Sequence, residues 1–157
     1  MLSVCDRHGL PRKGATSPPK GTRLLRHAGD LRWKGIKTER YKPQGDTWMD
    51  VLRRALIGPD DKTKFHVRYF EIAPGGYTTL EHHRHAHVVI GMKGTGVCRA
   101  GKKTFGVEKL DVLYICPGEV HQLRNPHEEP FGFLCIVDAK RDRPKGVSDP
   151  RLIAVKA

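Results

Sequence analysis

Residues 75–94 read GGYTTLEHHRHAHVVIGMKG and concentrate the histidines of this chain. Side chains at i and i+2 of a β-strand point to the same face, so Glu81 and His83 can converge on one point while the histidine between them faces away. A tight turn would then bring His87, which opens an apolar run, to the same point. Because neutral imidazole is the commonest protein ligand for transition metals, the stretch predicts two strands that carry a metal site.

A fourth ligand has to come from a distant strand, and His121 is the candidate. It follows the turn Pro117-Gly118-Glu119 and begins an apolar segment. Two other interpretations of the cluster are open: a solvent-exposed histidine patch, and a tract that binds metal without forming a specific centre, as a purification tag does. The turn residues Pro74-Gly75-Gly76 before the cluster and Gly94 after it favour a specific site.

The chain around this stretch consists of short apolar and β-branched runs separated by turn residues. Many short strands at close, regular spacing favour an all-β sandwich or barrel. The predicted strands are residues 65–72, 78–83, 87–92, 96–100, 103–107, 112–116, 121–124 and 131–137.

The segments on either side of residues 64–139, which hold the predicted barrel, differ from it in composition. Residues 1–30 contain three prolines and little apolar periodicity, which predicts an extended basic arm. Residues 31–63 predict a strand at 31–41 and a short helix over 46–58, packed on the barrel or on a dimer partner. Residues 140–157 predict a short basic C-terminal tail.

The net charge of +12, from 29 Lys and Arg against 17 Asp and Glu, lies mostly in the two flanks. Basic arms can bind polyanions, but stacking aromatic residues and a basic amphipathic helix are both missing, so we expect no nucleic-acid partner. No apolar run approaches the roughly 20 residues of a membrane helix, and we expect no membrane partner. The four cysteines form no CxxC pair, and without a secretion signal we expect reduced thiols and a cytoplasmic protein.

At this point the sequence resembles the cupin family. The first cupin motif, G(X)5HXH(X)3,4E(X)6G, fits the spacing of Gly75, Glu81, His83, His87 and Gly94 at every step. The second motif, G(X)5PXG(X)2H(X)3N, maps onto Leu110, Cys116, Gly118, His121 and Asn125. Because two separately framed motifs agree, the resemblance is specific, and it covers about residues 64–139.

The resemblance implies a double-stranded β-helix, or jelly-roll barrel, that holds one divalent transition metal. Glu81 stands where the family has its first histidine and His87 where it has its glutamate, so the set keeps three imidazoles and one carboxylate. The implied ligands are thus Glu81, His83, His87 and His121. A competing register pairs His83 with His85, but it leaves too little chain for the turn before His87, so His85 is the alternative ligand.

Other residues have weaker assignments. Leu110 and Cys116 replace the Gly and Pro of the second motif, which affects turn geometry more than coordination. His66 is a candidate partner for a ligand imidazole, because metal-bound histidines usually donate their other ring nitrogen to a second group. Three further polar residues near strands could orient a substrate, although the sequence does not fix which face they occupy. They are Arg68, Arg99 and Gln122.

This ligand set suits Fe, Mn, Ni, Co or Zn, with open positions left for a substrate. Members of the family that look like this include dioxygenases, isomerases and decarboxylases of small organic acids. The resemblance therefore implies a small-molecule metalloenzyme, dioxygenase-like or isomerase/decarboxylase-like, for a small organic acid or dicarbonyl compound. The alternative is a non-catalytic small-molecule-binding or sensor protein. Small cupins commonly pair through edge strands, which predicts a homodimer.

Overall fold

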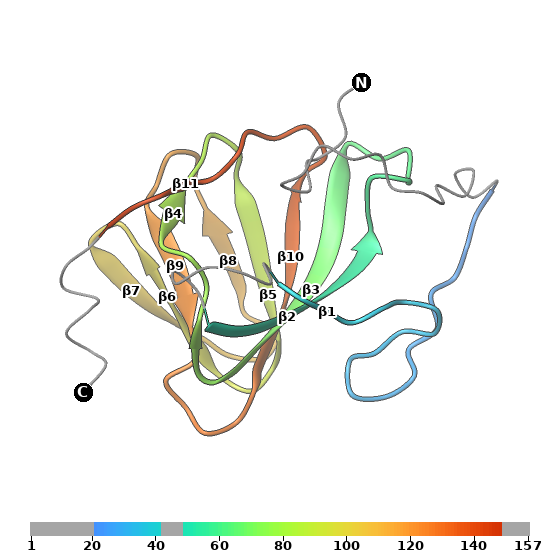
Figure 1. Cartoon of the computed structure of the whole chain (residues 1–157), viewed down its shortest axis with the longest axis horizontal. Coiled ribbons are helices and arrows are strands. Elements are labelled where there is room, and N and C mark those ends of the chain that lie inside the picture. Colours follow the sequence, from blue (N-terminus) through green and yellow to red (C-terminus); the bar gives the residue numbers. More distant parts are fainter. Residues whose placement is uncertain (1–20, 42–48, 149–157) are drawn as a thin grey trace.

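The structure, a computed structural model, describes residues 21–41 and 49–148 of the chain (Figure 1). Every regular element within these ranges is a β-strand, so the all-β prediction is confirmed. The strands are β1 (Glu39–Arg40), β2 (Met49–Ile57), β3 (Phe65–Tyr77), β4 (Glu81–His82), β5 (His87–Lys93), β6 (Gly96–Ala100), β7 (Lys103–Val107), β8 (Val112–Ile115), β9 (His121–Arg124), β10 (Phe131–Asp138) and β11 (Lys145–Gly146).

The strands form two antiparallel layers that face each other. One layer has the order β1-β2-β3-β10-β5-β8, and the other has the order β11-β4-β9-β6-β7. The long strand β3 joins the layers, because its last residue, Tyr77, pairs with Arg124 of β9. The sheet therefore curls into a nearly closed barrel, the jelly-roll arrangement that the sequence predicts (Figure 1).

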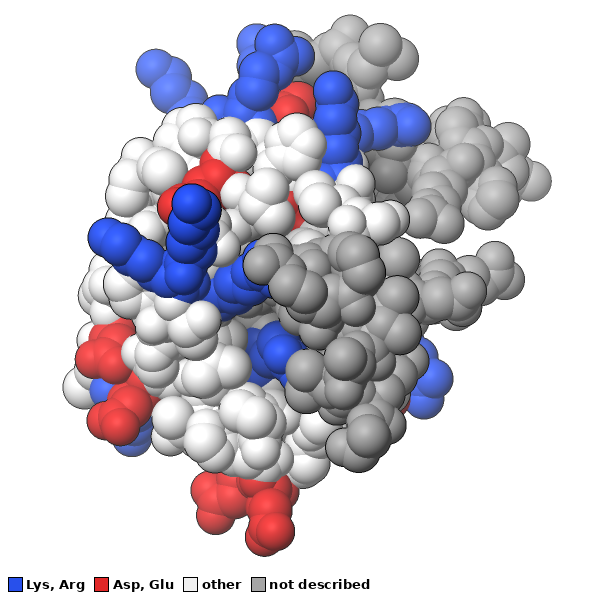
Figure 2. Space-filling model, turned by 90° about the vertical axis from the view of Figure 1, so that its left-hand side faces the viewer, with Lys and Arg blue, Asp and Glu red and all other residues white. Residues whose placement is uncertain are grey.

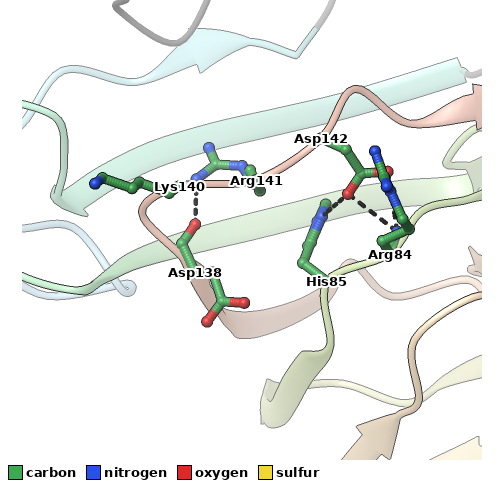
Figure 3. Close-up of a pocket in the computed structure, with 6 residues that line it drawn as sticks. All are labelled: Arg84, His85, Asp138, Lys140, Arg141 and Asp142. Atoms are coloured by element: carbon green, nitrogen blue, oxygen red, sulfur yellow. Dashed lines mark hydrogen bonds and ion pairs between the residues drawn. The ribbon is translucent and has the colours of Figure 1, made fainter. Parts of the chain in front are cut away.

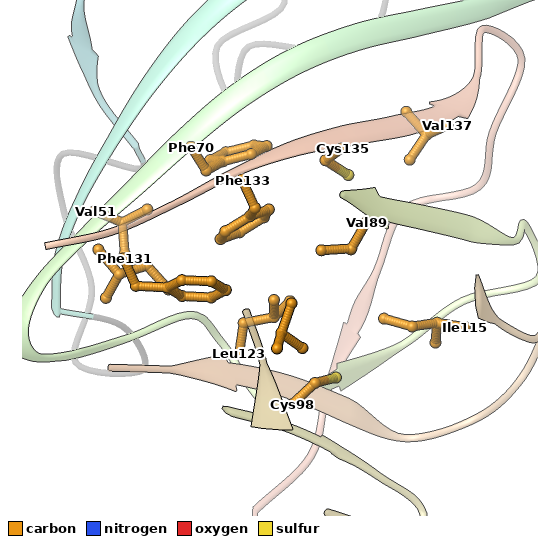
Figure 4. Packing of buried hydrophobic residues seen from close by; sticks show 12 residues of the cluster. Val51, Phe70, Val89, Cys98, Ile115, Leu123, Phe131, Phe133, Cys135 and Val137 are labelled. Carbon is orange, nitrogen blue, oxygen red and sulfur yellow. The ribbon is translucent and has the colours of Figure 1, made fainter. Parts of the chain in front are cut away.

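The core of the barrel lies between the two layers. On β10 the inward positions 131, 133, 135 and 137 are all buried, and Phe133 stacks on Phe70 of β3 with ring centroids 5.6 Å apart. Figure 4 shows these side chains beside Val89 of the neighbouring strand β5 and opposite Cys98 of β6 and Leu123 of β9 in the facing layer. Burial of each large apolar side chain contributes about 1.5–3 kcal/mol, so this layer of the interior stabilises the scaffold around the histidines.

The predicted helix over residues 46–58 is wrong, because residues 49–57 form strand β2. Residues 46–48 lie outside the described part of the chain. β2 pairs with β3 along most of its length, with Val51 opposite Ile72. Both faces of the strand are partly covered: Val51 points into the core, whereas Arg54 and Leu56 are buried on the other face. A strand covered on both faces does not alternate apolar and polar residues, so its period of two is hidden in the sequence.

The predicted strand over residues 31–41 is wrong except at Glu39–Arg40. Four residues between Gly29 and Gly35 have positive φ angles, which turn the chain instead of extending it. The segment packs on the outer face of its own barrel, where Trp33 lies 5.8 Å from the ring of Tyr69. The first 20 residues of the predicted arm lie outside the described residues.

The beginning of the predicted C-terminal tail also packs on the barrel. β11 pairs with β4, and the N–H of Val147 donates to the carbonyl of Leu80 at 2.9 Å. Residues 139–148 therefore lie across the end of the barrel where the histidines are found (Figure 1). Residues 149–157 are outside the described part.

Charge is unevenly spread over the face of the molecule in Figure 2. Lys and Arg side chains lie mainly on its upper and central parts, whereas Asp and Glu side chains lie at its lower and lower left edges and in smaller groups among the basic residues above. Among the described residues, no helix is long and apolar enough to cross a membrane.

Candidate metal centre

The three candidate imidazoles come from the two layers of the barrel. His83 follows β4, His87 opens β5, and His121 opens β9. Glu81 of β4 pairs directly with His121 of β9, which places the turn after β4 beside the start of β9. One potential ligand atom from each of the three histidines lies within 4.8 Å of the other two. All three side chains are buried, so they form a compact cluster inside the barrel.

Hydrogen bonds fix the orientation of two of these rings. Nδ1 of His83 lies 2.8 Å from the carbonyl oxygen of His85, and Nδ1 of His121 lies 2.8 Å from that of Glu119. A carbonyl oxygen can only accept, so each Nδ1 carries the proton and each Nε2 keeps its lone pair. Nε2 of His83 is buried and has no partner within the protein. A buried imidazole lone pair without a donor is what a metal-binding site requires, so these residues fit a divalent metal.

The cluster favours neutral imidazoles. Burial is the main reason that the pKa of His83 falls to about 4, and the neighbouring His85 and His121 lower it further. Burial also lowers the pKa of His87 strongly, followed by the effects of His83 and His121. The rings of His83 and His87 stack with centroids 4.4 Å apart, so protonating both would place two charges in contact. Near neutral pH the lone pairs are therefore available for a metal without prior loss of a proton.

His85 lies beside the cluster and is fixed by the C-terminal segment. Its ring stacks on that of His83 with centroids 3.6 Å apart, and its Nε2 lies 3.3 Å from Nε2 of His87. Nδ1 of His85 lies 3.0 Å from a carboxylate oxygen of Asp142, which also accepts the backbone N–H of Arg84. Burial lowers the pKa of His85, and the hydrogen bond to Asp142 opposes this effect. His85 does not belong to the three-histidine group and remains the alternative ligand.

An open basin of about 480 Å³ leads to His85 from the surface (Figure 3). Its walls come from the turn after β4 and from the segment after β10. The lining residues are Arg84, His85, Asp138, Lys140, Arg141 and Asp142. His85 is in contact with His83 and His87, so the basin lies next to the buried cluster.

The other residues singled out in the sequence lie at varying distances from the cluster. Glu81 is partly buried and does not belong to the three-histidine group, so its role as fourth ligand stays a prediction. His66 is buried, but its Nδ1 accepts from Arg141 at 3.0 Å, and its role as partner of a ligand also stays a prediction. Gln122 donates to the carbonyl of Thr78, and Arg99 donates to that of Gly101.

Arg68 points into the barrel toward the cluster. Its Nη2 donates to Sγ of Cys135 at 3.4 Å, and that sulfur lies 3.9 Å from Nδ1 of His87. Asp142, Arg141 and Cys135 carried no site prediction from the sequence. The only available signal was the placement of Cys135 in an alternating strand, because the two others lie in a segment without a recognisable pattern.

The jelly-roll barrel and its buried histidines define this chain as a cupin. Residues 68–137 match the Cupin_2 family, described as a cupin domain, and the chain belongs to the cupin superfamily. Among curated proteins it is similar to 1-methylthio-D-xylulose 5-phosphate methylsulfurylase of Rhodospirillum rubrum. The two are 38% identical over 127 residues, which cover 80% of this chain and 81% of the relative.

Two crystal structures support the same assignment. A cupin-2 domain protein of Rhodospirillum rubrum is 33% identical, with a TM-score of 0.71 over 87% of this chain and 89% of its own. A cupin 2 conserved barrel domain protein of Rhodopseudomonas palustris is 34% identical, with a TM-score of 0.76 over 85% of this chain and 92% of its own.

Proposed function

We propose that this chain is a metal-dependent enzyme that acts on a small, anionic keto compound, with a phosphorylated ketose as the preferred candidate. The single observation that carries the proposal is the buried, partnerless Nε2 of His83 beside two further neutral imidazoles. The similarity to a methylsulfurylase of a methylthio-ketose phosphate supports the substrate class. The proposal narrows the broader expectation of a small-molecule metalloenzyme, dioxygenase-like or isomerase/decarboxylase-like, to this substrate class.

His83, His87 and His121 would hold the metal, with the carboxylate of Glu81 as the proposed fourth ligand. Iron, manganese, nickel, cobalt and zinc all accept such donors. When bound, a divalent metal supplies Lewis acidity that polarises a carbonyl oxygen of the substrate. The apolar side chains of the barrel behind the histidines exclude competing water from that carbonyl.

His85 is the proposed proton carrier of the site. Because Asp142 accepts the proton of Nδ1, the lone pair of His85 is on Nε2, which lies 3.3 Å from Nε2 of His87, and His85 itself lines the open basin. A carboxylate on the far nitrogen of an imidazole orients the ring and stabilises its protonated form. His85 can thus take a proton from a carbon or hydroxyl group next to the polarised carbonyl, and Asp142 keeps the ring in place.

The proposed site of action is the cytoplasm. The three cysteines of the described residues are free thiols, and this supports a reducing compartment.

Elemental analysis of untagged protein, purified without added metal, tests the metal site. We expect near-stoichiometric metal in the parent and its loss in His83→Ala and His121→Ala. His82→Ala is the matched control, because its imidazole lies on the neighbouring strand position outside the cluster. Substoichiometric metal in the parent, or equal content in all four proteins, would overturn the site.

Turnover of 1-methylthio-D-xylulose 5-phosphate tests the activity. The NMR signal of the S-methyl group monitors consumption of this compound, and dithiothreitol is present to keep the thiols reduced. We expect turnover by the metal-loaded parent and loss of at least about 100-fold in His85→Ala, the scale of general acid–base catalysis. No turnover of this compound or of other ketose phosphates, combined with tight binding, would favour a binding or sensor protein instead.

A further inference from the structure

Three arginine side chains meet at the interior face of strands β2 and β3. Arg53 and Arg68 belong to these strands, and Arg141 comes from the segment after β10. Arg68 of β3 pairs with Cys135 of β10, whose side chain is in the core, so Arg68 also points inward. Arg53 of β2 pairs with Phe70, which is two residues further along the same face of β3. Residues opposite each other in antiparallel strands share a face, so Arg53 and Arg68 are diagonal neighbours.

Arg141 reaches this place from the segment after β10. Its Nη1 donates to Nδ1 of His66 at 3.0 Å and to the backbone carbonyl of Asp138 at 2.8 Å. These two acceptors are neutral, so they orient the guanidinium group without compensating its charge. Burial lowers the pKa of Arg141 to about 10, and the nearby charges of Arg68 and Arg53 contribute to this shift. Because His66 stands two residues before Arg68 on the same face of β3, its contact with Arg141 places this third guanidinium group at the face that carries Arg53 and Arg68.

The cluster has too few anions of its own. Among the described residues, Arg53 pairs with the carboxylate of Glu39 at 2.7 Å, whereas neither Arg68 nor Arg141 has a carboxylate partner. Of the two acids that line the basin, Asp142 is bound to Arg84 and His85, and the carboxylate of Asp138 forms no ion pair with Arg141. Nε of Arg53 and Nε of Arg68 are buried without a hydrogen-bond partner.

Buried, unpaired guanidinium donors are costly unless a ligand completes them. A planar guanidinium group matches two oxygens of a phosphate or carboxylate at once. The cluster also lies beside the histidines, because Cys135 contacts both Arg68 and His87. An anion held here would therefore belong to a molecule whose other end reaches the metal centre.

We propose that Arg53, Arg68 and Arg141 form an oxyanion subsite that binds the phosphate monoester group of the substrate. The proposal rests on the proposed function for the identity of the substrate, but binding of the phosphate itself requires no metal. Within that function the subsite selects phosphorylated ketoses over neutral ones. His66 is a positioning residue for Arg141.

Isothermal titration of the metal-free full chain with inorganic phosphate and with glycerol 3-phosphate tests the subsite. We expect Arg68→Gln and Arg141→Gln each to weaken binding of both probes about 10- to 100-fold, the scale of a lost charged hydrogen bond. Arg40→Gln is the matched control. It removes the same charge as the other two variants, but Arg40 is exposed on β1. Glycerol should not bind, and acetate should bind more weakly than phosphate.

Arg68 also stacks over Phe70, with 5.1 Å between its guanidinium carbon and the ring centroid, so Arg68→Gln can lose stability as well. Arg141 lies at the end of the barrel, outside its hydrophobic core. If Arg68→Gln does not fold, Arg141→Gln and Arg141→Lys therefore test the subsite. We expect Arg141→Lys to retain part of the affinity, since it keeps the charge and loses the planar donor pair. Undetectable phosphate binding by the parent at millimolar concentrations, or affinities unchanged in the Arg141 variants, would overturn the subsite.

The variant His121→Ala separates this proposal from the metal centre. It should lose the metal and keep its affinity for inorganic phosphate within about 2-fold, since the phosphate contacts come from arginines. Phosphate binding by a parent protein that contains no metal would support the subsite and contradict the proposal of a metalloenzyme. A parent protein that binds metal but no phosphate would support the metal centre and contradict the subsite.

Discussion

Replacing Leu110 by glycine should stabilise the protein. Leu110 stands at the glycine position of the second cupin motif, in the turn before β8, and its φ angle is 72°. This is the left-handed region, which a side chain with a β-carbon disfavours. The backbone N–H of Leu110 donates to the carbonyl of Gly91 at 2.8 Å, which holds the turn in that conformation. The side chain itself is 71% exposed and packs little.

The magnitude follows from two opposing effects. Releasing a left-handed leucine gains about 1–2 kcal/mol. The greater freedom of glycine in the unfolded chain costs about 0.4–1 kcal/mol. Because the leucine is largely exposed, little burial is lost, and the expected net gain in the free energy of unfolding is about 0.5–1 kcal/mol. For a chain of this length that corresponds to a rise in Tm of about 2–4 °C at the upper end.

Urea denaturation followed by circular dichroism measures this difference, with Lys109→Gly as the matched control in the same turn. Lys109 does not have a positive φ angle, so glycine brings it only the entropic cost. We expect Leu110→Gly to unfold at a higher urea concentration than the parent and Lys109→Gly at a lower one. If both variants were destabilised equally, the strain at Leu110, and with it the physical basis of this stabilisation, would be refuted.

Three further outcomes follow from the structure. The metal-free protein should lose stability as the pH is lowered from about 7 to about 5. Burial holds the pKa of His83 near 4 and that of His87 also low, so the unfolded chain binds more protons than the folded one in this range. Urea midpoints that stay constant over this range would contradict it. Tyr114→Asp should convert the predicted homodimer into a monomer by light scattering, since this side chain is 62% exposed on the edge strand β8, and a parent that is already monomeric would refute the prediction. A maleimide should modify the exposed Cys116 in the folded protein and leave Cys98 intact, because burial raises the pKa of Cys98 to about 12. Equal modification of both thiols by peptide mass spectrometry would argue against the buried environment of Cys98.

Three strands were predicted with the bounds that the structure gives them. The bounds predicted for residues 96–100, 103–107 and 121–124 coincide with β6, β7 and β9. β6 alternates buried and half-buried residues along its length, a pattern that period-two analysis detects. β2 escaped detection for the opposite reason, because a core covers one of its faces and the N-terminal segment covers the other.

The histidines were predictable because the chain concentrates them and the two motifs frame them. The arrangement around them was not. Asp142 and Arg141 are 55 or more positions beyond His85 and His66 respectively in the sequence, within a segment whose charge predicted a solvated tail. Only the pairing of β11 with β4 and the return of the chain after β10 bring them to the mouth of the barrel.

The sequence by itself determined the barrel and the residue types of its centre, because alternation, turn residues and motif spacing are local properties of the chain. Only the tertiary structure decided which side chains meet. It left Nε2 of His83 without a partner, placed Asp142 against His85, and brought Arg141 to His66 on the face of β3 that carries Arg68. The physical reason is that strand register and the path of the final segment set these contacts, and both depend on the packing of the whole barrel.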